Sequence, residues 1–329
     1  MASAQERLAF ALELLAKSDA RERVAGASEL VELAHAPELA SALRPAVQGL
    51  LAEADPQLRA AGTRALAALG PSPELVGTLE KCLQDPEAVV RREAARALGG
   101  MDDVAARSGL VSALADGDAQ VAFEAAVGLA GLGDDRGAEV LLAAVDDKVR
   151  RFFALGALAR ISEPRARAKA LGVLHKRLFI SDFERAQAAG LLTRLGDEAG
   201  RAYLLGRLQK KRADDRGLAM ELCGEHKLTE AIPLLRAALA DADELFRGTA
   251  ARSLGLLRDA DSEGALAAVA RDAATDYEVR CDAMEGLMFL RTPGALEVLH
   301  GLSAADSNEI REAANDALDW IQQHPENAS

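Results

Sequence analysis

Residues that could bind a metal ion or act as nucleophiles are few and scattered in this sequence. Its five histidines and three cysteines are His35, His175, His226, His300, His324, Cys82, Cys223 and Cys281. Neither HExxH, nor paired CxxC, nor GxxxxGK[ST] occurs, so the metal, thiol and phosphate chemistry of those motifs is not predicted. We therefore expect no catalytic residue, no metal site and no cofactor.

A basic and aromatic segment stands out in an otherwise acidic chain. Residues 148–216 hold 17 Lys and Arg against 7 Asp and Glu, a net charge of +10, whereas the remaining residues have a net charge of −23. Five of the eleven aromatic residues also fall in this segment. Because arginine and aromatic side chains are favoured at the centres of interfaces, this composition predicts a surface for a binding partner.

Three short stretches concentrate this signal, at 148–153, 175–183 and 209–212. Phe179 and Ile180 lie in a predicted turn between helices, where apolar residues need either a local pocket or a partner. The predicted partner-binding residues are Arg150, Arg151, Phe152, Lys176, Arg177, Phe179, Phe183, Lys210, Lys211 and Arg212. Three alternatives stay open at this point: aromatic residues that fill the core, basic residues on solvated helix faces, and a contact between copies of the chain.

The elements that position these residues follow from an internal repeat. The phrase DPEAVVRREAARALGG at 85–100 returns as DADELFRGTAARSLGLL at 241–257. Its arginine recurs as Arg59, Arg91, Arg185, Arg216, Arg247, Arg280 and Arg311, with Ala122 in its place once and either Arg150 or Arg151 once. The position seven residues later is Leu66, Leu98, Leu129, Leu158, Leu192, Cys223, Leu254, Leu287 and Leu318. A period of about 31 residues sustained in this way is typical of stacked repeats.

Each repeat is predicted to form two helices joined by an Asp-rich turn. The turn aspartates, at 85, 146–147, 214–215 and 241–243, could cap the second helix by accepting hydrogen bonds from its first N–H groups. Glycines such as Gly99 and Gly255 are expected to end that helix, as is the glycine-rich stretch 128–133. One hairpin cannot bury both of its apolar faces, so successive hairpins must stack.

The V-R-x-x-A-A-x-A-L-G phrase resembles the HEAT repeats, in particular the short bacterial units also found in phycobilin-lyase-like repeats. The resemblance covers residues 53–321 and implies an all-α fold, a right-handed α-α superhelix (HEAT-repeat solenoid) of about ten helical hairpins. Residues 1–52 are expected to form a degenerate N-terminal repeat continuous with that array, and residues 322–329 a flexible tail. The deoxyhypusine hydroxylases, HEAT-repeat enzymes, bind iron through repeated His-Glu dipeptides, which this sequence lacks.

The repeating arginine has two interpretations, a ladder of cations for a ligand or a structural tie between hairpins. We favour the structural one, in which each arginine pairs with turn aspartates of its own or the next repeat. Cys223 stands where other repeats have leucine, so it is expected to be a buried apolar residue and not a nucleophile.

Composition narrows the function further. The net charge of −13 argues against a surface devoted wholly to nucleic acid or to an anionic membrane. No apolar run approaches the roughly 20 residues of a membrane span. The odd and sparse cysteine count, with no recognisable signal peptide, favours the cytoplasm, and the Ala, Arg, Asp and Gly bias is typical of a bacterial protein.

We predict a non-enzymatic scaffold or adaptor that binds an acidic protein segment through the basic and aromatic residues of repeats five to seven. The alternatives are a nucleic-acid-binding HEAT-like protein and, third, a lyase-type enzyme or enzyme subunit.

Overall fold

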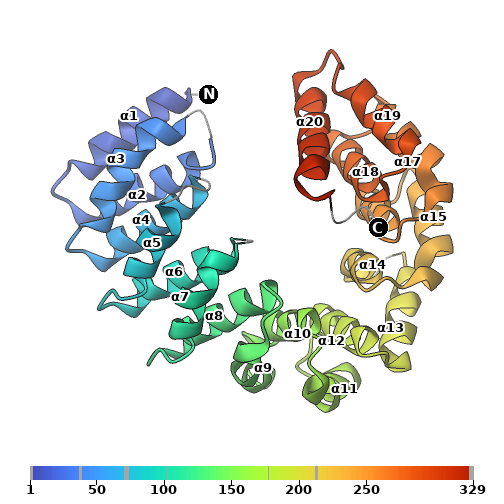
Figure 1. Ribbon diagram of the computed structural model, residues 1–329, viewed down its shortest axis with the longest axis horizontal. Helices are drawn as coiled ribbons and strands as arrows, with labels where there is room; N and C mark the ends of the chain where they lie inside the picture. Colours follow the sequence, from blue (N-terminus) through green and yellow to red (C-terminus); the bar gives the residue numbers. More distant parts are fainter. Residues whose placement is uncertain are drawn as a thin grey trace. The chain divides into compact units, whose positions relative to one another are not determined.

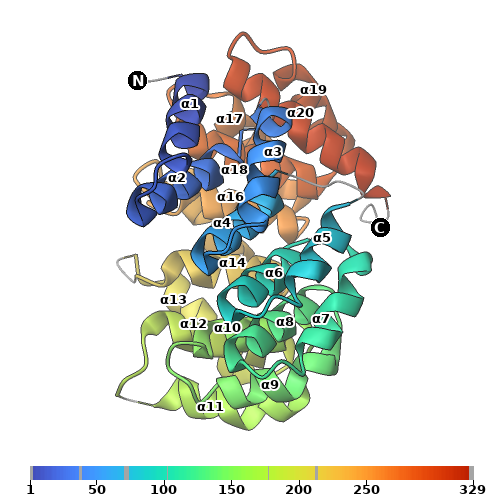
Figure 2. The ribbon, with the colours of Figure 1, turned by 90° about the vertical axis from the view of Figure 1, so that its left-hand side faces the viewer.

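The protein is all-helical. A computed structural model describes residues 3–36, 39–69, 74–101, 103–176, 178–211 and 214–325, which form twenty α-helices and no strand (Figures 1 and 2). The chain divides into two compact units, residues 1–163 and 164–329. Each unit is a stack of helical hairpins, as the repeat predicted.

The first unit contains five hairpins. Its helices are α1 (Ala4–Leu15), α2 (Ala20–Leu33), α3 (Ala40–Leu51), α4 (Pro56–Ala68), α5 (Leu75–Cys82), α6 (Ala88–Gly99), α7 (Arg107–Ala113), α8 (Ala119–Gly131), α9 (Ala138–Ala144) and α10 (Arg151–Arg160). Each odd-numbered helix packs against the even-numbered helix that follows it. The even-numbered helices also pack in succession, from α2 to α10, and so form one continuous layer.

The second unit repeats this arrangement. Its helices are α11 (Arg167–His175), α12 (Asp182–Arg194), α13 (Glu198–Leu208), α14 (Arg216–Glu225), α15 (Ile232–Ala240), α16 (Arg247–Leu256), α17 (Glu263–Arg271), α18 (Tyr277–Leu290), α19 (Pro293–Leu302) and α20 (Asn308–Gln323). Helices α12, α14, α16, α18 and α20 pack in succession. No described helix of either unit combines the length and the apolar character that a bilayer span requires.

The repeated leucine position forms the centre of each core. Leu98, Leu129, Leu158, Leu192, Leu254 and Leu287 are all fully buried. Removing such a side chain from water contributes about 2 kcal/mol of stabilisation. Cys223 takes the same place and is equally buried, and this burial raises the pKa of its thiol to about 12. The prediction that Cys223 is buried is therefore confirmed.

The prediction that aspartates cap the second helices is wrong for the turns it named. Asp85, Asp147 and Asp241 each accept a hydrogen bond from the backbone N–H two residues further on. These bonds lie within the turns, because α6, α10 and α16 begin later and have no side-chain cap. Aspartates do cap α2, α4, α8 and α18. Asp215 directly precedes its helix, but its side chain makes no capping bond. It is fully buried and turns instead toward other side chains of the second unit.

The prediction that Gly99 and Gly255 end their helices is confirmed for Gly99, the last residue of α6, and is off by one residue for Gly255, since α16 ends at Leu256. Neither glycine has the left-handed backbone expected of a helix end. Both instead permit close packing of neighbouring second helices. A Cβ on Gly99 would lie 2.7 Å from the Cα of Gly128, and a Cβ on Gly255 would lie 2.6 Å from the Cα of Gly286. Left-handed residues follow the second helices a few positions later, at Gly133, Ser162, Gly196, Lys227, Arg258 and Arg291. The expected helix end at Gly133 is thus confirmed.

The structural interpretation of the repeated arginine is also confirmed. Arg59 donates hydrogen bonds of 2.7 and 2.9 Å to Asp85 of the next hairpin, and two more to the carbonyl oxygens of Glu53 and Ala54 in its own turn. Carbonyl groups just before the second helix also accept bonds from Arg91, Arg151, Arg185, Arg216, Arg247, Arg280 and Arg311. These carbonyls end the first helix or form the turn, so the arginine joins two helices of one hairpin and often reaches the next.

Candidate partner-binding site

The predicted site residues of the first unit belong mainly to its framework. Arg151 is 7% exposed and takes the place of the repeated arginine, which resolves the one-residue ambiguity. Arg150 forms an ion pair with Asp147 at 3.0 Å. Phe152 is half-buried, with its ring edge-to-face against Phe153 at 5.4 Å between centroids. The exposed aromatic residue here is Phe153, which the prediction did not include.

Many of the basic side chains in the second unit are paired with acids. Lys211 forms an ion pair with Asp241, and the buried Arg216 forms one with Glu244. Both of these acids lie outside the basic segment counted in the sequence, so the net charge of that segment overstates the free positive charge. Arg177 and Arg212 fall outside the described residues.

The most exposed apolar residues of the second unit include two in the segment between α11 and α12. We call residues 176–183 the α11–α12 turn. Leu178 and Phe179 are 67% and 91% exposed, whereas Ile180 is buried. Phe183, in the first turn of α12, is 45% exposed. Residues 179 and 180 were both expected to need a local pocket or a partner; the protein itself buries Ile180, whereas Phe179 stays exposed.

The backbone at Phe179 is left-handed, with φ 60°. This region is a genuine outlier for a bulky residue, and holding one there costs about 1 kcal/mol or more. Such strain persists only where the surrounding structure enforces it, and it is common in ligand-binding segments. An aromatic side chain is therefore held outward by a backbone that would favour glycine.

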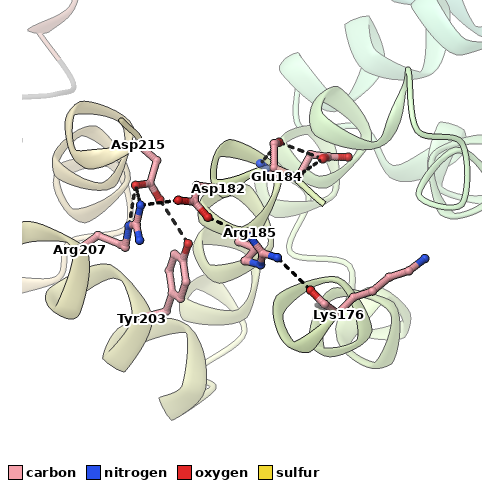
Figure 3. A network of polar contacts seen from close by, with 8 residues as sticks. Lys176, Asp182, Glu184, Arg185, Tyr203, Arg207 and Asp215 are labelled. Carbon is pink, nitrogen blue, oxygen red and sulfur yellow. Dashed lines mark hydrogen bonds and ion pairs between the residues drawn. The ribbon is translucent and has the colours of Figure 1, made fainter. Parts of the chain in front are cut away.

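Hydrogen bonds at both ends fix this turn (Figure 3). Ser181 and Glu184 form a capping box, in which each side chain bonds the backbone N–H of the other residue at 2.7 and 3.1 Å. Arg185 donates one bond to the Lys176 carbonyl oxygen at 3.0 Å and another to Asp182 at 2.8 Å. The start of α12 is thereby joined to the end of α11.

An ionic network that includes the fully buried Asp215 adjoins the turn (Figure 3). Arg207, on α13, contacts Asp182 at 2.8 Å and also forms an ion pair with the fully buried Asp215. The Tyr203 hydroxyl donates to Asp215 at 3.2 Å. Burial and the nearby Asp215 carboxylate raise the pKa of Tyr203, so the hydroxyl remains a donor. This network connects α12, α13 and the residues preceding α14.

Two lysines of the second unit, one in this turn and one after α13, remain available to a partner. The ammonium groups of Lys176 and Lys210 are exposed and make no ion pair or hydrogen bond with the rest of the described structure. Figure 3 shows the Lys176 side chain pointing away from the network. Asp182, by contrast, is bound by both Arg185 and Arg207. The Asp182 carboxylate is thus paired with arginines, whereas the ammonium groups of Lys176 and Lys210 are free to attract a partner.

Sequence reasoning missed a second group of basic residues, Lys227, Arg258 and Arg291, which line a pocket with Phe289 and Trp320. The available signal was the replacement of glycine by a cation at the end of three successive second helices. In the part of the chain that the structure describes, no three His, Cys, Asp or Glu side chains gather where they could hold a metal ion.

Stacked antiparallel helix pairs with a period near 31 residues define the class of α-helical repeat proteins. The HEAT repeats family matches residues 43–122, 78–159 and 232–319, more than half of the sequence. The chain therefore belongs to the HEAT-repeat family. A comparison with curated proteins found no match.

Solved structures share this helical fold. The complex of CpcE and CpcF of phycocyanin lyase from Nostoc sp. PCC7120 has a chain that is 20% identical, with a TM-score of 0.50, over 80% of this chain and 92% of that one. Human deoxyhypusine hydroxylase is 22% identical over 87% of this chain and 98% of its own, with a TM-score of 0.32. Kap121p is 13% identical over 99% of this chain and 47% of its own, with a TM-score of 0.41.

Proposed function

We propose that this protein is a non-enzymatic adaptor, and that its α11–α12 turn binds an acidic segment of a protein partner. The observation that supports this most strongly is Phe179, which is 91% exposed on a left-handed backbone. A HEAT-repeat fold is consistent with a scaffold or adaptor, because stacked hairpins offer long surfaces for contact.

The chemistry of the turn suggests what the partner is like. A phenylalanine ring that enters a partner's pocket buries 150–250 Å² and can act as a binding anchor. The free ammonium groups of Lys176 and Lys210 would attract carboxylates, which speeds encounter and rejects basic partners. An acidic segment with an apolar pocket or face matches both features.

The proposal is tested with a photo-crosslinking residue, p-benzoylphenylalanine, at position 179 in the native cell. We expect cross-links to a protein whose joined peptide is rich in Asp and Glu. Phe179→Gly relieves the left-handed backbone and removes the ring, so it should abolish binding of that partner while the protein stays folded. Lys176→Glu with Arg177→Glu should weaken the same binding by at least about tenfold through charge repulsion.

Leu245→Ala is the matched control, because Leu245 is 84% exposed in the equivalent turn of a later hairpin. This variant should bind the partner normally. If Phe179→Gly binds as well as the unchanged protein, or if the cross-linked peptides are not acidic, the proposal fails.

Nucleic-acid binding is the second candidate, favoured by the free lysines beside an exposed aromatic ring. The ion pairs of Arg185, Arg207 and Lys211 oppose it, since DNA affinity depends on cations that are free to neutralise phosphates. A salt titration of binding to plain duplex DNA separates the two functions. Binding that is absent even at low salt removes this candidate.

A lyase-type enzyme is the third candidate, and the fold shared with the CpcE–CpcF chain is what favours it. The adaptor proposal expects no bound chromophore. Absorbance of the protein purified from its native cell, which would reveal a bound tetrapyrrole, tests this directly.

A further inference from the structure

Three successive hairpins of the second unit end their second helices with a basic residue in a left-handed conformation. Lys227, Arg258 and Arg291 have φ of 57°, 53° and 55°. The equivalent positions after two other second helices are Gly133 and Gly196, and glycine takes this conformation without strain. A cation at such a corner costs about 1 kcal/mol relative to glycine, so three in a row call for a reason beyond chain geometry.

The three basic residues face one pocket. A cavity of about 250 Å³ is lined by Lys227, Leu256, Arg258, Phe289, Arg291 and Trp320. No carboxylate is among these lining residues. The pocket therefore combines positive charge with an aromatic and aliphatic wall, a combination that suits an anion attached to an apolar group.

The aromatic wall is built around Trp320. Its indole ring packs edge-to-face with Phe289, at 5.6 Å between centroids, and stacks on the His324 ring at 4.4 Å. The Arg291 guanidinium lies over the indole, 5.2 Å from its centroid. Arg291 is thus held in place by a cation–π contact, which does not use the hydrogen-bond donors of its Nη2 atom.

Two further observations concern the charges of Arg291 and Lys227. Among the described residues, the buried Nη2 atom of Arg291 has no hydrogen-bond partner, which is costly for a charged group. Lys227 donates to the Leu256 carbonyl oxygen, yet burial and the neighbouring Arg258 lower the pKa of its ammonium group. Like charges are therefore close together in a partly desolvated space. A bound oxyanion would satisfy the donor and offset the repulsion.

We propose that the pocket lined by Lys227, Arg258, Arg291 and Trp320 binds a phosphate monoester carried on an aromatic group. The unsatisfied guanidinium of Arg291 and the ammonium group of Lys227 together favour a dianion over a monoanion, and the arginine fork matches the geometry of phosphate oxygens. The aromatic body of the ligand packs against Trp320 and Phe289. This site is separate from the α11–α12 turn and does not depend on the adaptor function.

Phenyl phosphate is the probe, and Trp320 reports its binding because it is the only tryptophan in the sequence. We expect a saturable change in tryptophan fluorescence, and a matching heat of binding by calorimetry, with a Kd in the millimolar range or below. Phenylacetate, a monoanion of similar shape, should bind more weakly, and benzyl alcohol should not bind. Titrations at one ionic strength remove general salt effects.

Variants with glycine test the cations without straining the backbone. Arg258→Gly and Arg291→Gly should each weaken phenyl phosphate binding by about tenfold or more, while thermal unfolding occurs at the same or a higher temperature. Ser162→Gly makes the same backbone change at a corner of the first unit and removes no charge, so it should bind normally. Lys176→Glu should also bind normally, which separates this site from the adaptor surface.

The two sources of an aromatic phosphate are distinguished by a third ligand, a short peptide that contains phosphotyrosine. Tighter binding of the peptide than of phenyl phosphate assigns the site to a phosphorylated protein, and equal binding assigns it to a small molecule. The proposal is overturned if phenyl phosphate gives no saturable signal, if phenylacetate binds equally well, or if both glycine variants bind like the unchanged protein.

Discussion

The repeated arginine forms different contacts in the hairpins of the first unit and in the α11–α12 region of the second. Arg91 binds both carboxylate oxygens of Asp116 in the next hairpin, at 2.7 and 2.9 Å. Arg185, at the equivalent position, binds Asp182 on its own helix and a carbonyl of the preceding turn. The link to the next hairpin comes from Arg207 on α13, which forms an ion pair with Asp182 and is itself paired with Asp215 of its own hairpin.

This difference follows from the composition of the turns. In the regular hairpins the turn aspartate that receives the preceding arginine, such as Asp85 or Asp116, also accepts a backbone N–H bond within its turn. The α11–α12 turn has leucine, phenylalanine and isoleucine at 178–180, and its contact with the next hairpin is made by Arg207 and Asp182. The regular repeats thus join neighbouring hairpins through ion pairs, whereas exposed aromatic and basic side chains occur where the repeat pattern is interrupted.

The largest expected effect tests the network itself. Asp215→Ala leaves Arg207 with one carboxylate fewer and Tyr203 without its acceptor in a buried site, and should lower the free energy of unfolding by about 3 kcal/mol. Urea unfolding followed by the fluorescence of Trp320, which lies in the same unit, measures this loss. Asp214→Ala is the control, since Asp214 is exposed and should change stability by less than about 0.5 kcal/mol. Similar losses in the two variants would show that the Asp215 network does not contribute to the free energy of unfolding beyond what an exposed aspartate does.

The two uses of the arginine can be compared by double-mutant cycles. Arg91 and Asp116 are 18% and 11% exposed, so their coupling should reach about 1.5–3 kcal/mol. Arg185 and Asp182 are 19% and 44% exposed, and their coupling should stay below about 1 kcal/mol because Asp182 is better solvated. Unfolding free energies of the single and double alanine variants test both values. Equal coupling energies would contradict the difference drawn here between the two regions.

The smallest expected effect concerns the strain at Phe179. Phe179→Gly should raise the free energy of unfolding by up to about 1 kcal/mol, because glycine adopts the left-handed conformation without a steric cost. Leu245→Gly is the comparison, since that exposed turn residue has no positive φ, and it should be neutral or destabilising. A loss of stability in Phe179→Gly would mean that the ring is held by packing and not displayed under strain.

Much of the fold could be predicted from the sequence, because it is periodic and local. The spacing of Arg91, Leu98 and their counterparts predicted the paired helices, the buried leucine layer and the structural role of the arginine. The glycines were harder to interpret, since Gly99 and Gly255 serve contacts between helices about 30 residues apart in sequence. A one-dimensional pattern does not distinguish a glycine needed for packing from one needed for a turn.

The candidate site was less predictable for a related reason. The charge of residues 148–216 indicated a basic surface, but Lys211 and Arg216 are paired with acids beyond that segment. Phe152 and Phe153 are adjacent and alike in the sequence, yet the second is far more exposed. The basic pocket at Trp320 joins residues from four different helix ends, which no local motif reveals.

Residue types and their spacing are enough to specify a stack of helical hairpins and the residues of its buried layer. These properties depend on helix periodicity and on apolar burial, both of which are written in residue types and spacing. Only the tertiary structure decided which charges remain free, which aromatic rings face solvent, and where three basic corners meet. Ion pairing and exposure depend on distances between neighbouring hairpins, and these distances exist only once the repeats have packed together.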